Sequence, residues 1–281
     1  MPHSFADAAL ALRVEAGWSW AAEASTLAYG AARPDVGAAV IRPEGGVSVA
    51  TYYGPGSPLS QAVGLGLAGP VGDEALDRLE AFYDGLETPA SIEVATLSDP
   101  AFLPALSKRG YKIGETTHML VRPVEPGDAA SGPDGALRVD LVDPGDAATR
   151  AACNAVILRG FFEGPDDPPE GMADIMDAMT GAPGTSVWLA RVSGEPAGGA
   201  ALLVREGLAM LAGDATAPAS RRLGVQLALI RARLAEAARL GCDLATACTN
   251  PGSPSQRNYE RMGFRLAYAR VLMVRDPRAG G

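Results

Sequence analysis

The feature that most restricts the fold of this chain is a module that occurs twice, once before the middle and once at the end. Each copy has a helical pattern, a glycine that stops it and an apolar strand pattern. Aligned without gaps, the copies keep one offset of 153 residues, which pairs Gly110 with Gly263, Tyr111 with Phe264, Val121 with Val274 and Arg122 with Arg275. Self-similarity at a fixed offset predicts a duplicated domain. The alternative is a chance match between short apolar strands.

A stretch rich in Pro, Gly, Asp and Ala, residues 124–136, divides the chain almost in half. It has no apolar periodicity, and we predict that it links a domain over 1–123 to a domain over 137–281. With 281 residues, 47% of them hydrophobic, the chain can form two separate cores.

The second half has the pattern of a mixed α/β sheet. Its predicted elements are a strand over 137–142, a helix over 146–158, a hairpin that turns around Gly194, a strand over 207–215, a helix over 224–240, a strand over 243–249, a helix over 255–262 and a strand over 264–275. Consecutive short strands favour antiparallel pairing, and a strand, helix and strand in succession favour a parallel pair. The end of the first half repeats this plan, with helices over 74–86 and 100–111 and strands over 91–97 and 112–123.

Composition excludes several classes of protein. A net charge of −9 without a basic tract argues against sequence-independent nucleic-acid binding, which needs a Lys/Arg footprint. The chain has no run of eighteen or more apolar residues free of charge, which a membrane-spanning helix would need. The first apolar stretch also lacks the basic segment that precedes it in a signal peptide. We therefore expect a cytoplasmic protein.

The cysteines and histidines do not have the spacing of a metal site. Cys153, Cys242 and Cys248 are an odd number, and the chain has only two histidines, so no zinc is expected. All three thiols are predicted to be small buried groups. Trp188 alternates with apolar neighbours on a strand and is expected in the core.

The stretch TAPASRRLGVQ, residues 216–226, joins a strand pattern to the long helix. The first amides of a helix have no partner within it and lie at the positive end of its dipole, so they bind anions such as phosphate. Gly224 leaves the backbone open to a ligand oxygen, and Arg221 and Arg222 add positive charge. The stretch is a candidate pyrophosphate site, although an Arg-Arg pair before a helix is also common on solvated surface.

This stretch resembles the acetyl-CoA-binding loop of the GNAT superfamily of N-acetyltransferases, in which Arg/Gln-x-x-Gly-x-Gly/Ala opens a helix. Arg221 and Gly224 match the motif, whereas Gln226 replaces a small residue and Leu223 stands where a second basic residue is common. The resemblance implies two tandem GNAT-like (acyl-CoA N-acyltransferase) domains, with acetyl-CoA as cosubstrate of the second. The residues it implies for cofactor binding are Ala215, Thr216, Arg221, Arg222, Leu223, Gly224, Val225, Gln226, Asn250 and Asn258.

A second motif, Asn258 to Phe264, resembles the ending helix of the same family. Tyr259 lies four residues before the Gly-Phe pair, where the family has a tyrosine close to the thioester sulfur. A phenol there can protonate the departing thiolate. Asn250 opens a loop that is longer than expected for the family.

The resemblance implies direct attack of a neutral amine on the thioester in a ternary complex, with positioning as a main source of rate. A backbone amide near Ala215 or Thr216 would stabilise the oxyanion. Asp214 and Glu163 are the candidate bases. The loop over 159–170 carries Phe161 and Phe162 beside four carboxylates, which suits a cationic amine with an apolar part, small molecule or peptide; a solvated acidic loop with both rings in the core is the alternative.

Other functions stay open at this stage. An acyltransferase for longer acyl groups would keep the same motifs. A non-catalytic acyl-CoA-binding regulatory module would be favoured if Tyr259 pointed away from the cleft or if the strands beside Asp214 stayed paired. The N-terminal copy has Leu106 opposite Tyr259 and lacks the glycine motif, so we expect a degenerate GNAT-like domain that packs, closes the cleft or supports a homodimer.

Overall fold

The computed structural model describes residues 6–130, 137–162 and 168–277, which form two compact units. Unit 1 comprises residues 1–119 and 266–281, and unit 2 comprises residues 120–265. These units differ from the boundaries predicted above, because the final strand β11 (Arg265–Arg275) pairs antiparallel with β4 (Ala90–Ala95) of unit 1. The strand pattern identifies the strand itself, but it carries no information on which neighbour the strand will choose.

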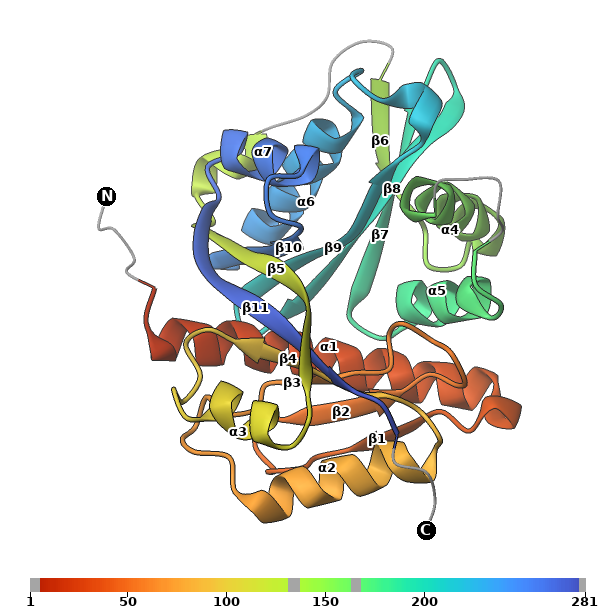
Figure 1. The fold of residues 1–281 in the computed structure, drawn as a ribbon. Coiled ribbons are helices and arrows are strands. Elements are labelled where there is room, and N and C mark those ends of the chain that lie inside the picture. The colour runs from red at the N-terminus through yellow and green to blue at the C-terminus, as the bar shows by residue number, and fades with distance from the viewer. Residues whose placement is uncertain (1–5, 131–136, 163–167, 278–281) are drawn as a thin grey trace. The chain divides into compact units, whose positions relative to one another are not determined.

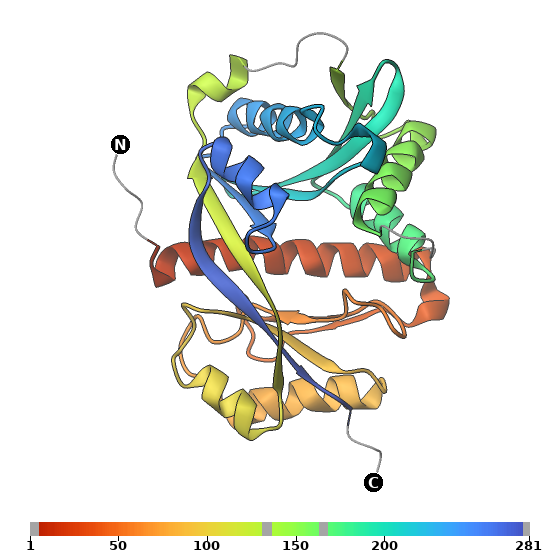
Figure 2. The same ribbon diagram turned by 45° about the horizontal axis from the view of Figure 1, so that its top comes forward.

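Unit 1 contains a sheet with a helix on each face (Figures 1 and 2). Its strands are β1 (Ala39–Ile41), β2 (Val49–Tyr52), β3 (Ala62–Val63), β4, β5 (Lys112–Pro123) and β11, in the order β1-β2-β3-β4-β11-β5. Helix α1 (Ala8–Ala32) packs on β1, β2 and β3, and α2 (Asp73–Gly85) packs on β4, with α3 (Phe102–Lys108) on the same face as α2 (Figure 2).

A buried ion pair connects α1 to β11 within unit 1. Arg270 donates to Glu15 at 2.8 Å, and Tyr268 donates to the same carboxylate at 2.6 Å. Arg270 also pairs with Glu93 of β4 at 2.6 Å. Removing one partner of a buried ion pair strongly destabilises a fold, because it leaves the other charge buried without compensation.

Unit 2 has the mixed sheet that the sequence predicts. Its strands β6 (Leu137–Leu141), β7 (Thr185–Val192), β8 (Glu195–Arg205), β9 (Leu208–Thr216) and β10 (Leu244–Thr249) lie in the order β10-β9-β8-β7-β6. All neighbours pair antiparallel except β9 and β10, which are parallel. Helices α4 (Ala147–Phe161) and α5 (Met172–Gly181) cover one face, and α6 (Val225–Arg239) covers the other, next to α7 (Pro254–Arg261) (Figure 2).

Two consecutive glycines of β8 let helices approach the sheet from both sides. A Cβ on Gly198 would lie 2.7 Å from the Val225 side chain of α6, and a Cβ on Gly199 would lie 2.6 Å from the Cys153 sulfur of α4. Both distances are shorter than a van der Waals contact. Because successive residues of a strand face opposite sides of the sheet, the two glycines leave room for a close helix on each face.

The repeated module has the same hydrogen bonds in both copies. The Tyr111 amide donates to the Leu106 carbonyl at 3.1 Å, and the Phe264 amide, 153 residues later, donates to the Tyr259 carbonyl at 3.1 Å. Gly110 and Gly263 both have a positive φ, 88° and 84°, which the turn after each helix requires. The two copies therefore share a backbone conformation as well as a sequence pattern.

Part of the predicted linker has regular structure and packs on unit 2. Pro126–Ala130 forms a short 3-10 helix that packs on α6, and Arg122 pairs with Asp128 at 3.0 Å within it. Asp128 also accepts the Glu125 amide at 2.9 Å, and Val124 packs against the core of unit 2. Residues 131–136 lie outside the described part of the chain.

Candidate active site

A β-bulge in β9 sets the position of Asp214. Gly199 lies opposite Ala215 and Ala201 opposite Ala212, so β9 has an extra residue in this stretch, and Gly213 there adopts a φ of 59°. A bulge shifts the alternation of side chains along a strand. As a result Ala215 packs with α4, whereas the side chain of Asp214 faces α6.

Strands β9 and β10 part at the same place. Their parallel pairing joins Leu208–Leu211 to Leu244–Ala247, and β9 then continues through the bulge to Thr216. The strands beside Asp214 therefore separate. A non-catalytic module would be favoured if these strands stayed paired.

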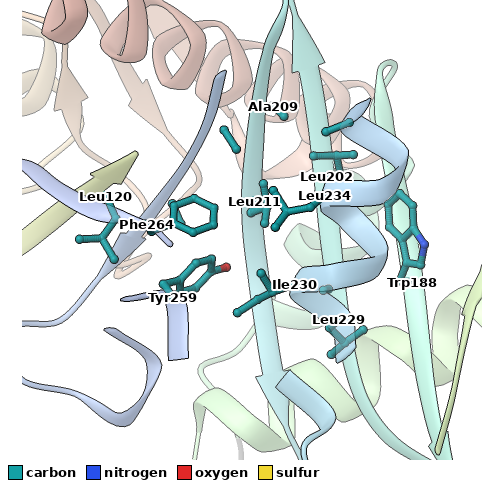
Figure 3. Packing of buried hydrophobic residues seen from close by; sticks show 14 of the residues in the cluster. Leu120, Trp188, Leu202, Ala209, Leu211, Leu229, Ile230, Leu234, Tyr259 and Phe264 are labelled. Atoms are coloured by element: carbon teal, nitrogen blue, oxygen red, sulfur yellow. The ribbon is translucent and has the colours of Figure 1, made fainter. Parts of the chain in front are cut away.

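Asp214 and Tyr259 form a short hydrogen bond in the interior. The Tyr259 hydroxyl donates to Oδ1 of Asp214 at 2.6 Å, and both side chains are buried, at 1% and 8% exposure. Figure 3 shows the phenol beside Phe264, with its hydroxyl directed toward the strand that carries Leu211. Tyr259 thus points toward Asp214 rather than outward.

A third buried group, Arg233 of α6, completes this cluster. One guanidinium nitrogen lies 3.4 Å from Asp214 Oδ1 and donates to the Tyr259 oxygen at 3.3 Å. Burial raises the pKa of Tyr259 well above its ordinary value, while the charge of Arg233 opposes that shift and the charge of Asp214 adds to it. Burial by itself lowers the pKa of Arg233, but Tyr259 and Asp214 outweigh it, so the guanidinium stays charged.

Gln226 bridges the bulge to α7. Its amide nitrogen donates to Asp214 Oδ2 at 2.6 Å and to Ser255 Oγ at 2.8 Å, and its oxygen accepts from Asn258 at 2.7 Å. The residue that departs from the family motif therefore uses its side chain to join β9, α6 and α7. Small residues at this position could not make this bridge.

The N-terminus of α6 is open in the way expected for an anion site. The helix begins at Val225 with Gly224 as its N-cap, no side chain of the described residues caps it, and its first internal bond runs from the Ala228 amide to the Gly224 carbonyl. A Cβ on Gly224 would meet no described atom within 4 Å. Arg222 adopts a φ of 64°, a conformation unusual for a side chain of its size, and Arg221, Arg222 and Leu223 are exposed.

The remaining predicted cofactor residues lie near these groups. Ala215 and Thr216 pair with β8 at the end of β9. Asn250 is exposed in the turn before α7, where its carbonyl accepts from the Ser253 amide at 3.2 Å. The structure brings Asp214, Gln226, Asn258 and Tyr259 into one network and leaves Asn250 at its edge.

On the other side of β9, α4 approaches the strand end through Gly160. A Cβ there would lie 2.6 Å from that of Ala215, so only glycine allows this contact. Phe161 is 55% exposed, which contradicts the alternative that both rings are in the core. Glu163, the second candidate base, lies outside the described residues together with Asp166 and Asp167.

Predictions for isolated residues had mixed outcomes. Trp188 is in the core, as expected, and Cys153 and Cys242 are buried. The prediction was wrong for Cys248, which is exposed and lies past the part of β10 that pairs with β9. Among the described residues, no three His, Cys, Asp or Glu side chains are placed to hold a metal, and no described helix has the length and apolarity to cross a bilayer.

Arg233 was not predicted from the sequence. It lies four residues after Leu229 and three after Ile230, both buried, so it occupies the apolar stripe of α6. A charged residue on such a stripe is a signal that could have identified it. At the offset of 153, unit 1 has Gln61, Glu80 and Leu106 in place of Asp214, Arg233 and Tyr259.

Part of the chain matches a known protein family. Residues 156–264 match the model of the acetyltransferase (GNAT) family, and this segment, which includes the bulge, α6 and α7, therefore belongs to that family. A search of curated proteins found no match.

Solved structures match over most of the chain. A GCN5-related N-acetyltransferase from Kribbella flavida is 21% identical, with a TM-score of 0.60 over 91% of this chain and 96% of that one. A tandem GNAT protein from the clavulanic acid biosynthesis pathway is 13% identical, with a TM-score of 0.60 over 83% of this chain and 79% of that one. At these identities the likeness shows the fold, and it confirms the predicted tandem GNAT-like architecture.

Proposed function

We propose that the protein is an N-acetyltransferase that transfers the acetyl group of acetyl-CoA to an amine in a ternary complex. The observation that carries this proposal is the hydrogen-bonded pair Asp214 and Tyr259 at the bulge, beside the open N-terminus of α6, within a segment of the GNAT family. Unit 2 would carry the chemistry, and unit 1, with Leu106 at the tyrosine position, would serve as a degenerate domain.

The residues present fit acetyl-CoA. The amides of Val225, Gln226 and the rest of the first turn of α6, with Arg221 and Arg222, would hold the pyrophosphate. Positions Gly213 and Gly224 have open space where a side chain would start, so the backbone is accessible to a ligand. Acetyl-CoA supplies the activated acetyl group, and Thr216, Asn250 and Asn258 would contact its arm.

Because Tyr259 has a single hydrogen to donate, its proposed role as an acid depends on the protonation state of Asp214. A phenol has one hydrogen, and in this structure it is given to Asp214. If Asp214 accepts a proton from the attacking nitrogen, its own O–H can donate to the phenol oxygen, and the Tyr259 hydrogen becomes available to the sulfur.

The atoms balance over this sequence. The ammonium first loses one proton to solvent, and the C–N bond then forms as the C–S bond breaks, with the electron pair of that bond kept by sulfur. A second nitrogen proton passes to Asp214, from Asp214 to Tyr259, and from Tyr259 to sulfur. Both side chains end in their starting forms.

The test is a calorimetric titration with acetyl-CoA and free CoA. We expect micromolar binding at one site per chain, and loss of at least 30-fold in affinity, or about 2 kcal/mol, for Gly224→Glu, which places a carboxylate beside the anion site. Gly241→Glu is the matched control, since Gly241 also has open space and a positive φ but lies at the opposite end of α6. Equal losses in both variants, or no binding by the intact protein, would refute the site.

A non-catalytic acyl-CoA-binding module is the second candidate. The observation in its favour is the burial of Tyr259, whose hydrogen is already donated. A non-catalytic module would bind CoA but would not release CoA from acetyl-CoA when it is assayed with primary amines that carry an apolar part, such as tyramine. Release that depends on Tyr259 would support the enzyme.

A further inference from the structure

Arg233 is the most unusual charged residue of unit 2, because its side chain is completely buried. Taking a charge out of water costs several kcal/mol unless partners satisfy it. Leu229 and Leu234 on the same stripe pack in the core without such a cost. The position would therefore favour an apolar residue if packing were the only requirement.

Apart from one bond within its own helix, the contacts of Arg233 lie at the bulge and at Tyr259. Its Nη1 donates to the carbonyls of Ala201 and Ala212 at 3.2 and 3.3 Å, which are the opposed residues where the strand register shifts. Its Nε donates to the Leu229 carbonyl at 3.1 Å. The other nitrogen contacts Asp214 and Tyr259. One planar group thus joins the backbone distortion to both proposed catalytic side chains.

We propose that Arg233 is the positioning residue of this site, fixing the bulge and the phenol oxygen so that Asp214 and Tyr259 act as one proton-transfer pair. The inference rests on the proposed function. In the observed network, the Tyr259 oxygen accepts from Arg233 and donates to Asp214, so it is held from two sides. Without Arg233 the phenol keeps one of these two bonds, and Asp214 loses the guanidinium that lies 3.4 Å from its carboxylate.

Unit 1 lacks the whole arrangement at the corresponding positions. Glu80 replaces Arg233 there and is also buried, and Leu106 cannot donate a proton. An arginine in the middle of this helix is therefore not a requirement of the fold, since the repeated module forms without it.

The experiment measures whether Arg233 acts through Tyr259. CoA and desulfo-CoA, which lacks the sulfur, are titrated at pH 9, where a thiol with an ordinary pKa near 8.5 is mostly ionised. A thiolate that binds together with one proton on Asp214 receives the Tyr259 hydrogen, because the Asp214 O–H then donates to the phenol oxygen. The native protein should therefore prefer CoA, by about tenfold for one charge-assisted bond. The titrations are repeated with Arg233→Lys, Tyr259→Phe and the double variant.

We expect each single variant to lose the preference for CoA while its affinity for desulfo-CoA changes less than threefold, and the double variant to match Tyr259→Phe. Such non-additivity is the sign of residues that act together. Equal weakening of both ligands by Arg233→Lys would show a purely structural role and overturn the proposal, as would a native protein without preference. Failure of both ligands to bind the native protein would instead refute the proposed function.

Two further variants keep the result interpretable. Arg270→Lys removes the same guanidinium fork from a buried ion pair of unit 1, and it should leave both affinities unchanged. If Arg233→Lys does not fold, Asp214→Asn/Arg233→Met removes both charges together and avoids an unpaired buried charge. It too should lose the preference for CoA, and a retained preference would overturn the proposal.

Discussion

At the scale of single residues, burial changes the chemistry of the ionisable groups in the core of unit 2. Cys153 is fully buried under Gly199, and its thiol donates to the Trp188 carbonyl at 3.3 Å. Burial raises the pKa of this thiol from 9.0 to about 12. The group is therefore inert at neutral pH, but it makes the stability of the fold depend on pH under alkaline conditions.

The sign follows from proton counting. Below pH 9 the thiol of Cys153 is protonated in both states, so its contribution is constant. Between pH 9 and about 12 the unfolded chain has lost this proton and the folded chain keeps it, so stability falls by about 1.4 kcal/mol per pH unit. In Cys153→Ala this contribution is absent.

We expect the stability advantage of the native protein over Cys153→Ala to shrink by about 2 kcal/mol between pH 8 and pH 10.5. Urea unfolding of both proteins over this range measures the difference, and the other titrating groups cancel because both chains contain them. A difference that stays constant with pH would show that the thiol ionises normally in the folded state.

Site residues differ in how far sequence could identify them. Tyr259 and Gly224 lie in motifs, and their local setting, a helix end and a helix start, follows from adjacent residues. Arg233 contacts Asp214, 19 residues away, and that contact depends on a bulge that no motif marks. From the sequence, Gln226 was identified only as a departure from the family motif. In the structure its side chain makes the hydrogen bond that joins α6 to α7.

At the scale of elements, the glycine pair of β8 controls how closely two helices approach the sheet. Gly199→Ala brings a methyl group against Cys153 and Ile157 of α4, and Gly198→Ala brings one against Val225 of α6 and the Ala215 carbonyl. Overpacking of this kind costs about 1–3 kcal/mol. We expect both variants to lose stability by that amount in urea unfolding.

The two variants should differ in ligand binding. Gly198→Ala displaces the first turn of α6 and should weaken CoA binding, while Gly199→Ala displaces α4 and should leave it within about twofold. Gly181→Ala is the control, since a Cβ at this helix end meets no described atom within 4 Å. A stable Gly198→Ala with native affinity would contradict this account of the packing.

Elements were predictable where burial follows hydrophobicity. Except for α5, for which no range was predicted, the strands and helices of unit 2 lie close to their predicted ranges, because their buried positions are apolar at strand or helix spacing. Helix α1 was missed, since the positions that it buries include Glu15, Ser19, Ser25 and Thr26. Glu15 accepts from Tyr268 at 2.6 Å, and Ser25 bonds to Tyr53 at 2.7 Å. With such polar groups buried, the helix has no continuous apolar stripe to detect.

At the scale of the whole molecule, the pairing of β11 decides which segments can fold alone. The predicted boundaries would make residues 1–123 an independent domain. In the structure, β11 supplies Met273 to the core of unit 1 and Arg270 to the buried Glu15. A chain without β11 leaves that carboxylate unpaired, at a cost of about 3–5 kcal/mol, and also exposes a strand edge and part of the apolar core. The stability of a whole domain is only about 5–15 kcal/mol.

A chain that ends at residue 265 tests whether the first half of the chain folds alone or needs β11. We expect unit 1 to unfold in it, because the Glu15 charge and the core around Ile92 lose their partners, while unit 2 keeps its fold and binds CoA. Limited proteolysis with mass spectrometry should locate the new cuts between residues 8 and 119, and a chain that ends at residue 277 should resist like the full protein. If residues 8–119 remain protected without β11, the first half folds by itself, and the strand contributes to unit 1 without being required for it.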